Sequence, residues 1–94
     1  MDFSLSTFTL EVNQTATLVF QAKWASDAED IGFKWAQDHA QRISTKGPHG
    51  TDLPAVVKVR VARPDEKAAY EVGGHTELYA GVKIVYLIDL SSLS

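Results

Sequence analysis

The chain contains no cysteine among its 94 residues. This absence excludes disulfide bonds, thiol chemistry and cysteine-based zinc sites. A disulfide-stapled secreted scaffold is excluded for the same reason, so a reducing cytoplasm is the simplest expected location. Long hydrophobic runs are missing too, since no stretch approaches the ~20 apolar residues that span a bilayer. The first residues lack the basic and apolar segments of a signal peptide, and we expect no membrane association.

Catalytic and cofactor motifs are also missing. The sequence has no G-x-S-x-G elbow and no glycine-rich phosphate loop. Its histidines, His39, His49 and His75, are too far apart to show metal-ligand spacing. The acidic clusters at 27–30 and 65–66 are explained by the dipole of a helix N-terminus. We therefore predict a protein without enzymatic activity, cofactor or bound metal.

What is present fits one small folded domain over residues 1–94. The chain is 45% hydrophobic and 22% charged, and nine aromatic side chains (two Trp, four Phe and three Tyr) can fill a core. The net charge of −3 argues against nucleic acid or an anionic membrane as a bulk electrostatic partner.

The first two predicted elements are strands. Residues 3–12 and 16–24 alternate between apolar and polar side chains, which is typical of half-buried strands. Asn13 and Gln14 lie between them, and asparagine tolerates the positive φ that a tight turn requires. The pattern predicts a β-hairpin.

A helix is predicted next. Ser26 and Glu29 have the spacing of a capping box, and a helix should run from there to about Ile43. The residues expected to build or widen its apolar face are Ala28, Ile31, Phe33, Trp35, Ala36, His39, Ala40 and Ile43. Gly32 lowers helix propensity, so it is expected to mark a close approach to the sheet.

The second half of the chain contains shorter segments. Residues 44–54 carry glycines and prolines and are predicted to form a long loop, either a binding loop or a mobile one. Residues 56–61 are predicted to be a strand, and 64–72 a short helix that begins at a proline and stops before two glycines. Residues 75–81 are predicted to be a linker, and 82–90 the last strand.

The predicted order is therefore β-β-α-β-(short α)-β. The compact arrangement for this order is an α+β fold, in which one main helix packs on one face of a four-stranded, mainly antiparallel sheet. The last strand is apolar on both of its faces, which a small chain struggles to cover. We hypothesise that an uncovered sheet face or an edge strand forms a symmetric homodimer, with Lys83, Val85 and Leu87 at the interface.

Two alternatives use other residues. Lys58, Arg60 and Arg63 form a basic stripe that predicts contact with nucleic acid, although no stacking aromatic accompanies them on that strand face. Trp24 and Trp35 are expected to approach each other, either as core packing or as the wall of a small-ligand pocket.

Parts of the chain resemble a known group of proteins. The segments Phe8–Val12 with Leu18–Ala22, Arg60–Glu71 and Val85–Leu90 resemble small uncharacterised proteins of alphaproteobacteria. The resemblance implies a bacterial cytoplasmic protein and carries no activity to transfer. Together with the missing catalytic motifs, it leads us to expect a non-enzymatic protein-interaction or regulatory module.

Overall fold

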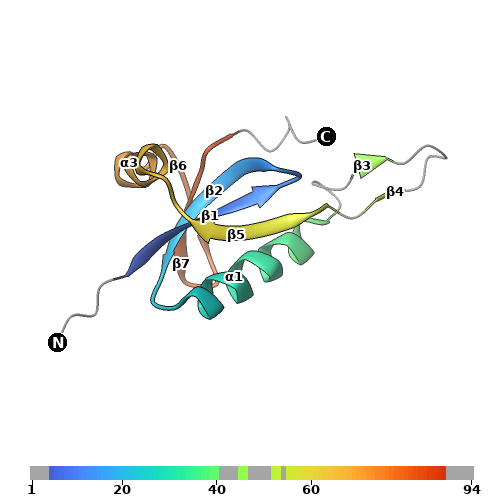
Figure 1. The fold of residues 1–94 in the computed structure, drawn as a ribbon, viewed down its shortest axis with the longest axis horizontal. Coiled ribbons are helices and arrows are strands. Elements are labelled where there is room, and N and C mark those ends of the chain that lie inside the picture. The colour runs from blue at the N-terminus through green and yellow to red at the C-terminus, as the bar shows by residue number, and fades with distance from the viewer. Residues whose placement is uncertain (1–4, 41–44, 47–51, 54, 89–94) are drawn as a thin grey trace.

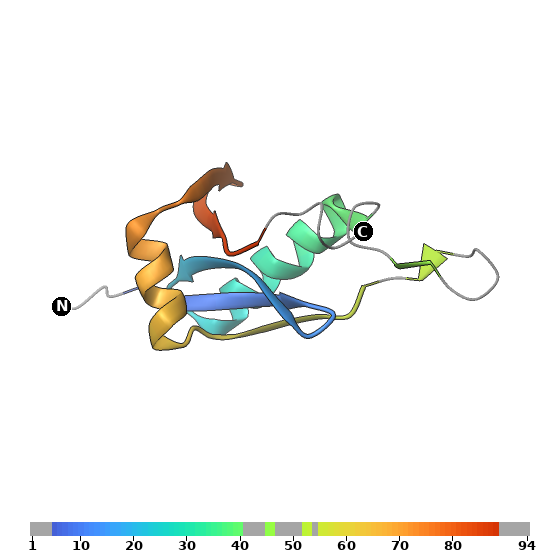
Figure 2. The ribbon, with the colours of Figure 1, turned by 90° about the horizontal axis from the view of Figure 1, so that it is seen from above.

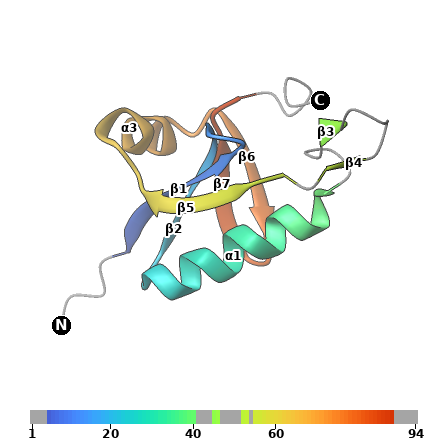
Figure 3. The same cartoon turned by 45° about the vertical axis from the view of Figure 1, so that its right-hand side comes forward.

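The computed structural model describes residues 5–40, 45–46, 52–53 and 55–88. The fold is α+β, as predicted, with a five-stranded antiparallel sheet in the order β5-β1-β2-β7-β6 (Figure 1). The elements are β1 (Ser6–Val12), β2 (Thr15–Ala22), α1 (Ala25–Asp38), β3 (Thr45–Lys46), β4 (Asp52–Leu53), β5 (Val57–Val61), α3 (Pro64–Val72), β6 (His75–Tyr79) and β7 (Val82–Tyr86). Helix α1 runs along one face of the sheet and α3 crosses the other (Figure 3).

The sheet has one strand more than predicted. The segment 75–81, expected to be a linker, contains β6 and a turn to β7. Four of the five β6 side chains are exposed, so the strand lacks the apolar alternation that reveals a strand. The last strand ends at Tyr86, before the predicted end at Leu90, which lies outside the described residues.

The predicted loop 44–54 contains the short strands β3 and β4, and its remaining residues lie outside the described part. The two strands pair with each other rather than with the main sheet. Figure 2 shows them beyond the end of the sheet that is opposite α3. This segment therefore contributes no strand to the main sheet.

Both hairpins of the main sheet close with two residues of positive φ. Asn13 and Gln14 have φ values of 51° and 69°, which confirms the predicted turn between β1 and β2. Ala80 and Gly81 have φ values of 51° and 79° between β6 and β7. Positive φ at both central positions is typical of a type I′ turn, whose twist matches that of the flanking strands.

The boundaries of α1 differ from the prediction. The helix begins at Ala25 with Trp24 as its N-cap, and no side chain caps it. The predicted capping box from Ser26 to Glu29 is therefore wrong, because Ser26 already lies in the first turn. The helix ends at Asp38, and the predicted continuation over 41–43 lies outside the described residues.

The core lies between α1 and the sheet. Its buried members are Phe8, Leu10, Val12, Leu18, Phe20, Ala22, Ala28, Trp35, Ile84 and Tyr86. Gly32 lies at the tightest approach, since a Cβ there would be 2.6 Å from Cγ2 of Val59. This geometry confirms the predicted close contact. Phe33, expected to widen the apolar face of the helix, is exposed instead.

Candidate protein interface and adjacent cleft

Arg60, predicted to contact nucleic acid, lies in a network of carboxylates on the α3 side of the sheet. Its Nε donates to Oε2 of Glu11 at 2.5 Å, and its terminal nitrogens donate to both oxygens of Glu66 at 2.7 and 2.8 Å. Glu66 also accepts from the Thr9 hydroxyl at 2.9 Å and from the backbone N–H of Arg63 at 2.8 Å. The network joins β1, β5 and the first turn of α3.

The network shifts the pKa values of its members. The hydrogen bonds from Arg60, followed by those from Arg63 and Thr9, outweigh burial and lower the pKa of Glu66 to about 2. The same carboxylates raise the pKa of Arg60. Two acids thus neutralise the middle cation of the predicted stripe, while Lys58 and Arg63 remain exposed. The described geometry gives no support to a three-cation surface for phosphates.

The three residues expected at a dimer interface have different environments. Val85 is only 1% exposed, so its own chain covers it. Leu87 is half-buried and donates its backbone N–H to the carbonyl of Thr17 at 2.8 Å. Lys83 is exposed, and its Nζ lies 4.7 Å from the ring centroid of Tyr70 in α3. Val85 is therefore not available to a partner on this sheet face, while the roles expected for Lys83 and Leu87 stay predictions.

The two tryptophans do not meet. Trp24 is 61% exposed at the start of α1, whereas Trp35 is buried against the sheet, with Nε1 3.3 Å from the Tyr86 hydroxyl. They are eleven positions apart, so at a rise of 1.5 Å per residue the helix separates them by about 16 Å along its axis. The small-ligand pocket expected between the two tryptophans is therefore not formed.

His39 is a packing residue, as predicted. Its ring stacks on Trp35 at 4.3 Å between centroids, and its Nδ1 donates to the Trp35 carbonyl at 2.8 Å. The Tyr79 hydroxyl donates to Asp38, so the end of β6 is fixed to the end of α1. Burial, and then this hydrogen bond, raise the pKa of Tyr79 to about 12. No group of three metal-ligating side chains converges within the described ranges.

Strand β6 leaves one edge of the sheet open. Leu78 is 76% exposed, and Tyr79 is the only half-buried residue of the strand. A two-residue type I′ turn closes on a hydrogen-bonded pair, here Tyr79 with Val82. The N–H and C=O groups of successive residues in a strand point to opposite sides. Because those of Tyr79 point towards β7, those of Thr76 and Leu78 point away from it. In the described chain no strand pairs with that edge.

The opposite edge, β5, is different. It carries an exposed lysine, Lys58, within its five residues, and an exposed charge discourages pairing along an edge. Asn13 also bonds to the backbone just before this strand, through Val56 N–H to Oδ1 at 3.0 Å and through its own N–H to the Val56 carbonyl at 2.8 Å. The β6 edge is therefore the better template for another strand.

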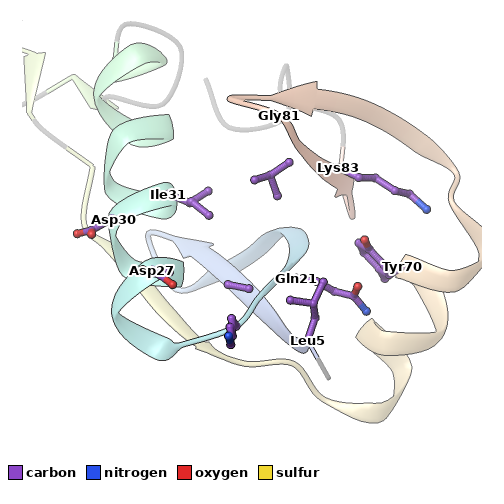
Figure 4. A pocket seen from close by; sticks show the side chains of 11 residues that line it. Leu5, Gln21, Asp27, Asp30, Ile31, Tyr70, Gly81 and Lys83 are labelled. Carbon is purple, nitrogen blue, oxygen red and sulfur yellow. The ribbon is translucent and has the colours of Figure 1, made fainter. Parts of the chain in front are cut away.

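A cleft of about 550 Å³ lies beside the β6–β7 hairpin (Figure 4). The residues that line it come from both helices and the strands between them: Leu5, Gln21, Ala22, Lys23, Asp27, Asp30, Ile31, Tyr70, Gly81, Val82 and Lys83. Ile31 of α1 lies on one side in Figure 4, and Tyr70 and Lys83 lie on the other. The volume is in the range of sites for small ligands, and neither tryptophan lines it.

Comparison with known proteins adds no relative. No protein-family model, no curated protein and no solved structure shows a significant match to the chain. The resemblance to alphaproteobacterial proteins therefore stays a prediction. In the described part of the chain, no helix is both long and apolar enough to cross a membrane.

Proposed function

We propose that this protein is a non-enzymatic protein-interaction module that pairs with a second copy of itself through the β6 edge. The observation that carries the proposal is the open edge itself, with outward backbone groups at Thr76 and Leu78 and an exposed leucine. Strand addition uses such edges, because main-chain hydrogen bonds supply affinity and side chains supply specificity. A second copy provides an identical edge, so a two-fold axis closes the assembly after one step.

Charge favours one register for antiparallel pairing of the two edges. An axis at Glu77 places two carboxylates directly opposite each other, which is destabilising. An axis at Leu78 pairs Thr76 with Ala80, whose φ of 51° cannot continue a ladder. An axis at Thr76 places His75 opposite Glu77 of the second copy and Leu78 opposite Gly74 of the second copy. The two-fold axis repeats the contact between His75 and Glu77, so this register forms two complementary contacts. We therefore propose this register.

The solution mass of matched variants tests the pairing. By size-exclusion chromatography with light scattering, we expect the wild type to have twice the chain mass of 10.3 kDa. Leu78→Lys adds a charge at the outward edge and should give a mass near 10.3 kDa. Val61→Lys is the control, because Val61 is 62% exposed on the other edge strand. A monomeric wild type, or an equal effect of both variants, would rule out pairing through β6.

The register has its own test in Glu77→Gln. With the axis at Thr76, this change removes a charge-assisted contact between His75 and Glu77 of the second copy, so dimer dissociation should become severalfold easier. With the axis at Glu77, it removes a repulsion and dimerisation should tighten. The dissociation constant from analytical ultracentrifugation at pH 6 therefore separates the two registers by its direction of change. Tighter dimerisation would overturn the register while leaving the β6 edge as the interface.

A further inference from the structure

Strand β5 forms the second open edge of the sheet, and its hydrogen bonds fix which backbone groups face outward. The N–H of Ala62, the residue after the strand, donates to the carbonyl of Thr7 at 3.0 Å, so Ala62 points its backbone groups towards β1. The direction of these groups alternates along the chain. The residues that point their N–H and C=O groups away from β1 are therefore Val57, Val59 and Val61. Among the described strands, none lies beyond this edge.

The same three valines form an apolar row on the α1 side of the edge. Cγ2 of Val59 faces Gly32 of α1, and side chains two residues apart in a strand share a face. Val57 and Val61 therefore point to the α1 side as well. Val57 and Val59 are half-buried, and Val61 is 62% exposed. The chain thus leaves this apolar row incompletely covered.

Phe33 extends the apolar row from α1. Successive residues of a helix are about 100° apart around its axis, so Ile31 and Phe33 lie on opposite flanks of Gly32. Ile31 lines the cleft on the β7 side of the helix (Figure 4), which places Phe33 along the outer side of β5. Phe33 is 45% exposed there. Glu29, four residues earlier, lies on the same flank and would repel an acidic side chain.

The α3 side of the edge is positively charged. Lys58 and Arg60 alternate with the valines, so their side chains lie on the side where Arg60 contacts Glu66 of α3. Glu11 lies opposite Lys58 on β1, but its carboxylate accepts from Arg60. Both ion pairs of the described residues belong to Arg60, so Lys58 contacts no carboxylate there. An anionic group beside β5 would meet this exposed lysine.

These charges determine which kind of strand the edge accepts. Two-fold pairing of β5 with a second copy about Lys58, Val59 or Arg60 would place two cationic side chains opposite each other, which is destabilising. An acidic strand replaces this repulsion with attraction. We propose that β5 binds an extended acidic and apolar segment of another protein as an added antiparallel strand. This inference goes beyond the proposed function, because it concerns β5 rather than β6.

The outward backbone groups define the register. Val59 exchanges two hydrogen bonds with the central residue of the segment, whose apolar side chain lies on the α1 side. The next residue lies opposite Lys58 and is acidic, because an antiparallel segment runs against β5. The preceding residue lies opposite Arg60, which two carboxylates already neutralise, and is uncharged. The two outer residues lie opposite the other valines and are apolar. Val61 offers its N–H to the segment, since its carbonyl accepts from Arg60 at 3.2 Å.

Titration of the whole chain with acetylated and amidated Val-Thr-Val-Glu-Val tests the proposal by ¹H–¹⁵N NMR. We expect saturable shifts of the Val57, Val59 and Val61 amide signals, because their N–H groups gain an acceptor. Shifts confined to Thr76 and Leu78 would place the peptide on β6 and overturn the assignment. Absence of shifts at the three valines up to about 5 mM peptide would overturn it too.

Two N-methylated peptides test the hydrogen bonds. Methylation of the third residue removes the N–H that donates to the Val59 carbonyl and should weaken binding at least about tenfold. Methylation of the second residue, whose N–H points away from β5, should change the dissociation constant by less than about threefold. Equal effects of the two methylations would overturn strand addition in this register.

Charge reversal tests the assigned cation. Lys58→Glu should weaken binding of the glutamate peptide at least about fivefold and strengthen binding of Val-Thr-Val-Lys-Val. Lys34→Glu is the matched control, because it changes the net charge equally at an exposed position of α1 that points away from the sheet. Equal effects of the two reversals would overturn the role of Lys58.

The variants that test β6 also separate the two proposals. Leu78→Lys should bind the peptide like the wild type. Val61→Lys introduces a charge into the apolar row and should weaken the peptide at least about fivefold. The opposite pattern would overturn the assignment to β5. A dimeric protein that binds no peptide would refute this inference alone, and a monomeric protein that binds it would refute the proposed function alone.

Discussion

At the scale of single residues, Glu66 is a charged side chain that the fold buries and surrounds with hydrogen-bond donors. It accepts hydrogen bonds from Arg60, Thr9 and the backbone of Arg63, and it is almost fully buried. A buried carboxylate is tolerated only when its partners replace the water that it loses. Glu66 therefore joins α3 to the sheet by charge and hydrogen bonding rather than by apolar packing.

The low pKa of Glu66 makes stability depend on pH. Its pKa falls from 4.5 in the unfolded chain to about 2 in the fold. Its contribution, on the order of 3 kcal/mol, is therefore present above pH 4.5 and is lost as the pH falls towards 2. Glu66→Gln should lower the free energy of unfolding at pH 7 by about this amount. It should also weaken the dependence of this free energy on pH below pH 4.5. Urea unfolding between pH 2 and 7 measures both effects.

The control for that experiment is Glu71→Gln, which neutralises an exposed carboxylate on the same helix. It should leave the free energy of unfolding within about 0.5 kcal/mol of the wild type at every pH. If the free energy of unfolding of Glu66→Gln fell as steeply below pH 4.5 as that of the wild type, the role assigned to Glu66 would be contradicted.

Gly32 offers a second test at this scale. Alanine usually stabilises a helix by about 1 kcal/mol relative to glycine. Here its Cβ would lie 2.6 Å from Cγ2 of Val59, so we expect Gly32→Ala to destabilise by about 1–3 kcal/mol instead. The added Val59→Ala removes that methyl group, and a double-mutant cycle by thermal unfolding should show favourable coupling between the two changes. A Gly32→Ala variant more stable than the wild type would disprove the close approach.

At the scale of elements, the turn between β6 and β7 contains a residue in a costly conformation. Ala80 has a φ of 51°, which alanine adopts at a cost of about 1–2 kcal/mol and asparagine at less. Ala80→Asn creates the Asn-Gly pair preferred in type I′ turns and should raise the free energy of unfolding by about 0.5–1 kcal/mol. Ala80→Val, with a β-branched side chain, should lower it. Chemical denaturation measures the free energy of unfolding of both variants. If both substitutions changed it in the same direction, this turn assignment would be refuted.

The elements differ in how far the sequence predicts them. The first hairpin is readable because its strands alternate and Asn13 marks the turn. The short helix α3 is readable from Pro64 at its start and Gly73, with a φ of 68°, at its end. Apolar periodicity does not predict β6, because an edge strand with exposed side chains lacks such periodicity. The signal available for it was the turn residue Gly81, which directly precedes a dense β-forming run.

At the scale of the whole molecule, the sites depend on contacts between distant segments. Lys58 and Arg60 alternate as a surface stripe would, yet β5 pairs with β1 and brings Arg60 to Glu11, 49 residues away. Sequence spacing does not reveal that partner. The prediction that Lys83 takes part in an interaction stays a prediction, and the structure adds the cleft beside it. Residues of both helices and of β2 and β7 line the cleft, and no local sequence pattern brings such distant segments together.

The central claim is that β6 pairs with a second copy in solution, and amide hydrogen exchange tests it most directly. The N–H groups of Thr76 and Leu78 point away from β7, whereas that of Glu77 points towards it. We predict slow exchange of Thr76 and Leu78 at high protein concentration, with protection lost on dilution while Glu77 stays protected. Rapid exchange of Thr76 and Leu78 at every concentration, beside a protected Glu77, would show an unpaired edge and contradict the account.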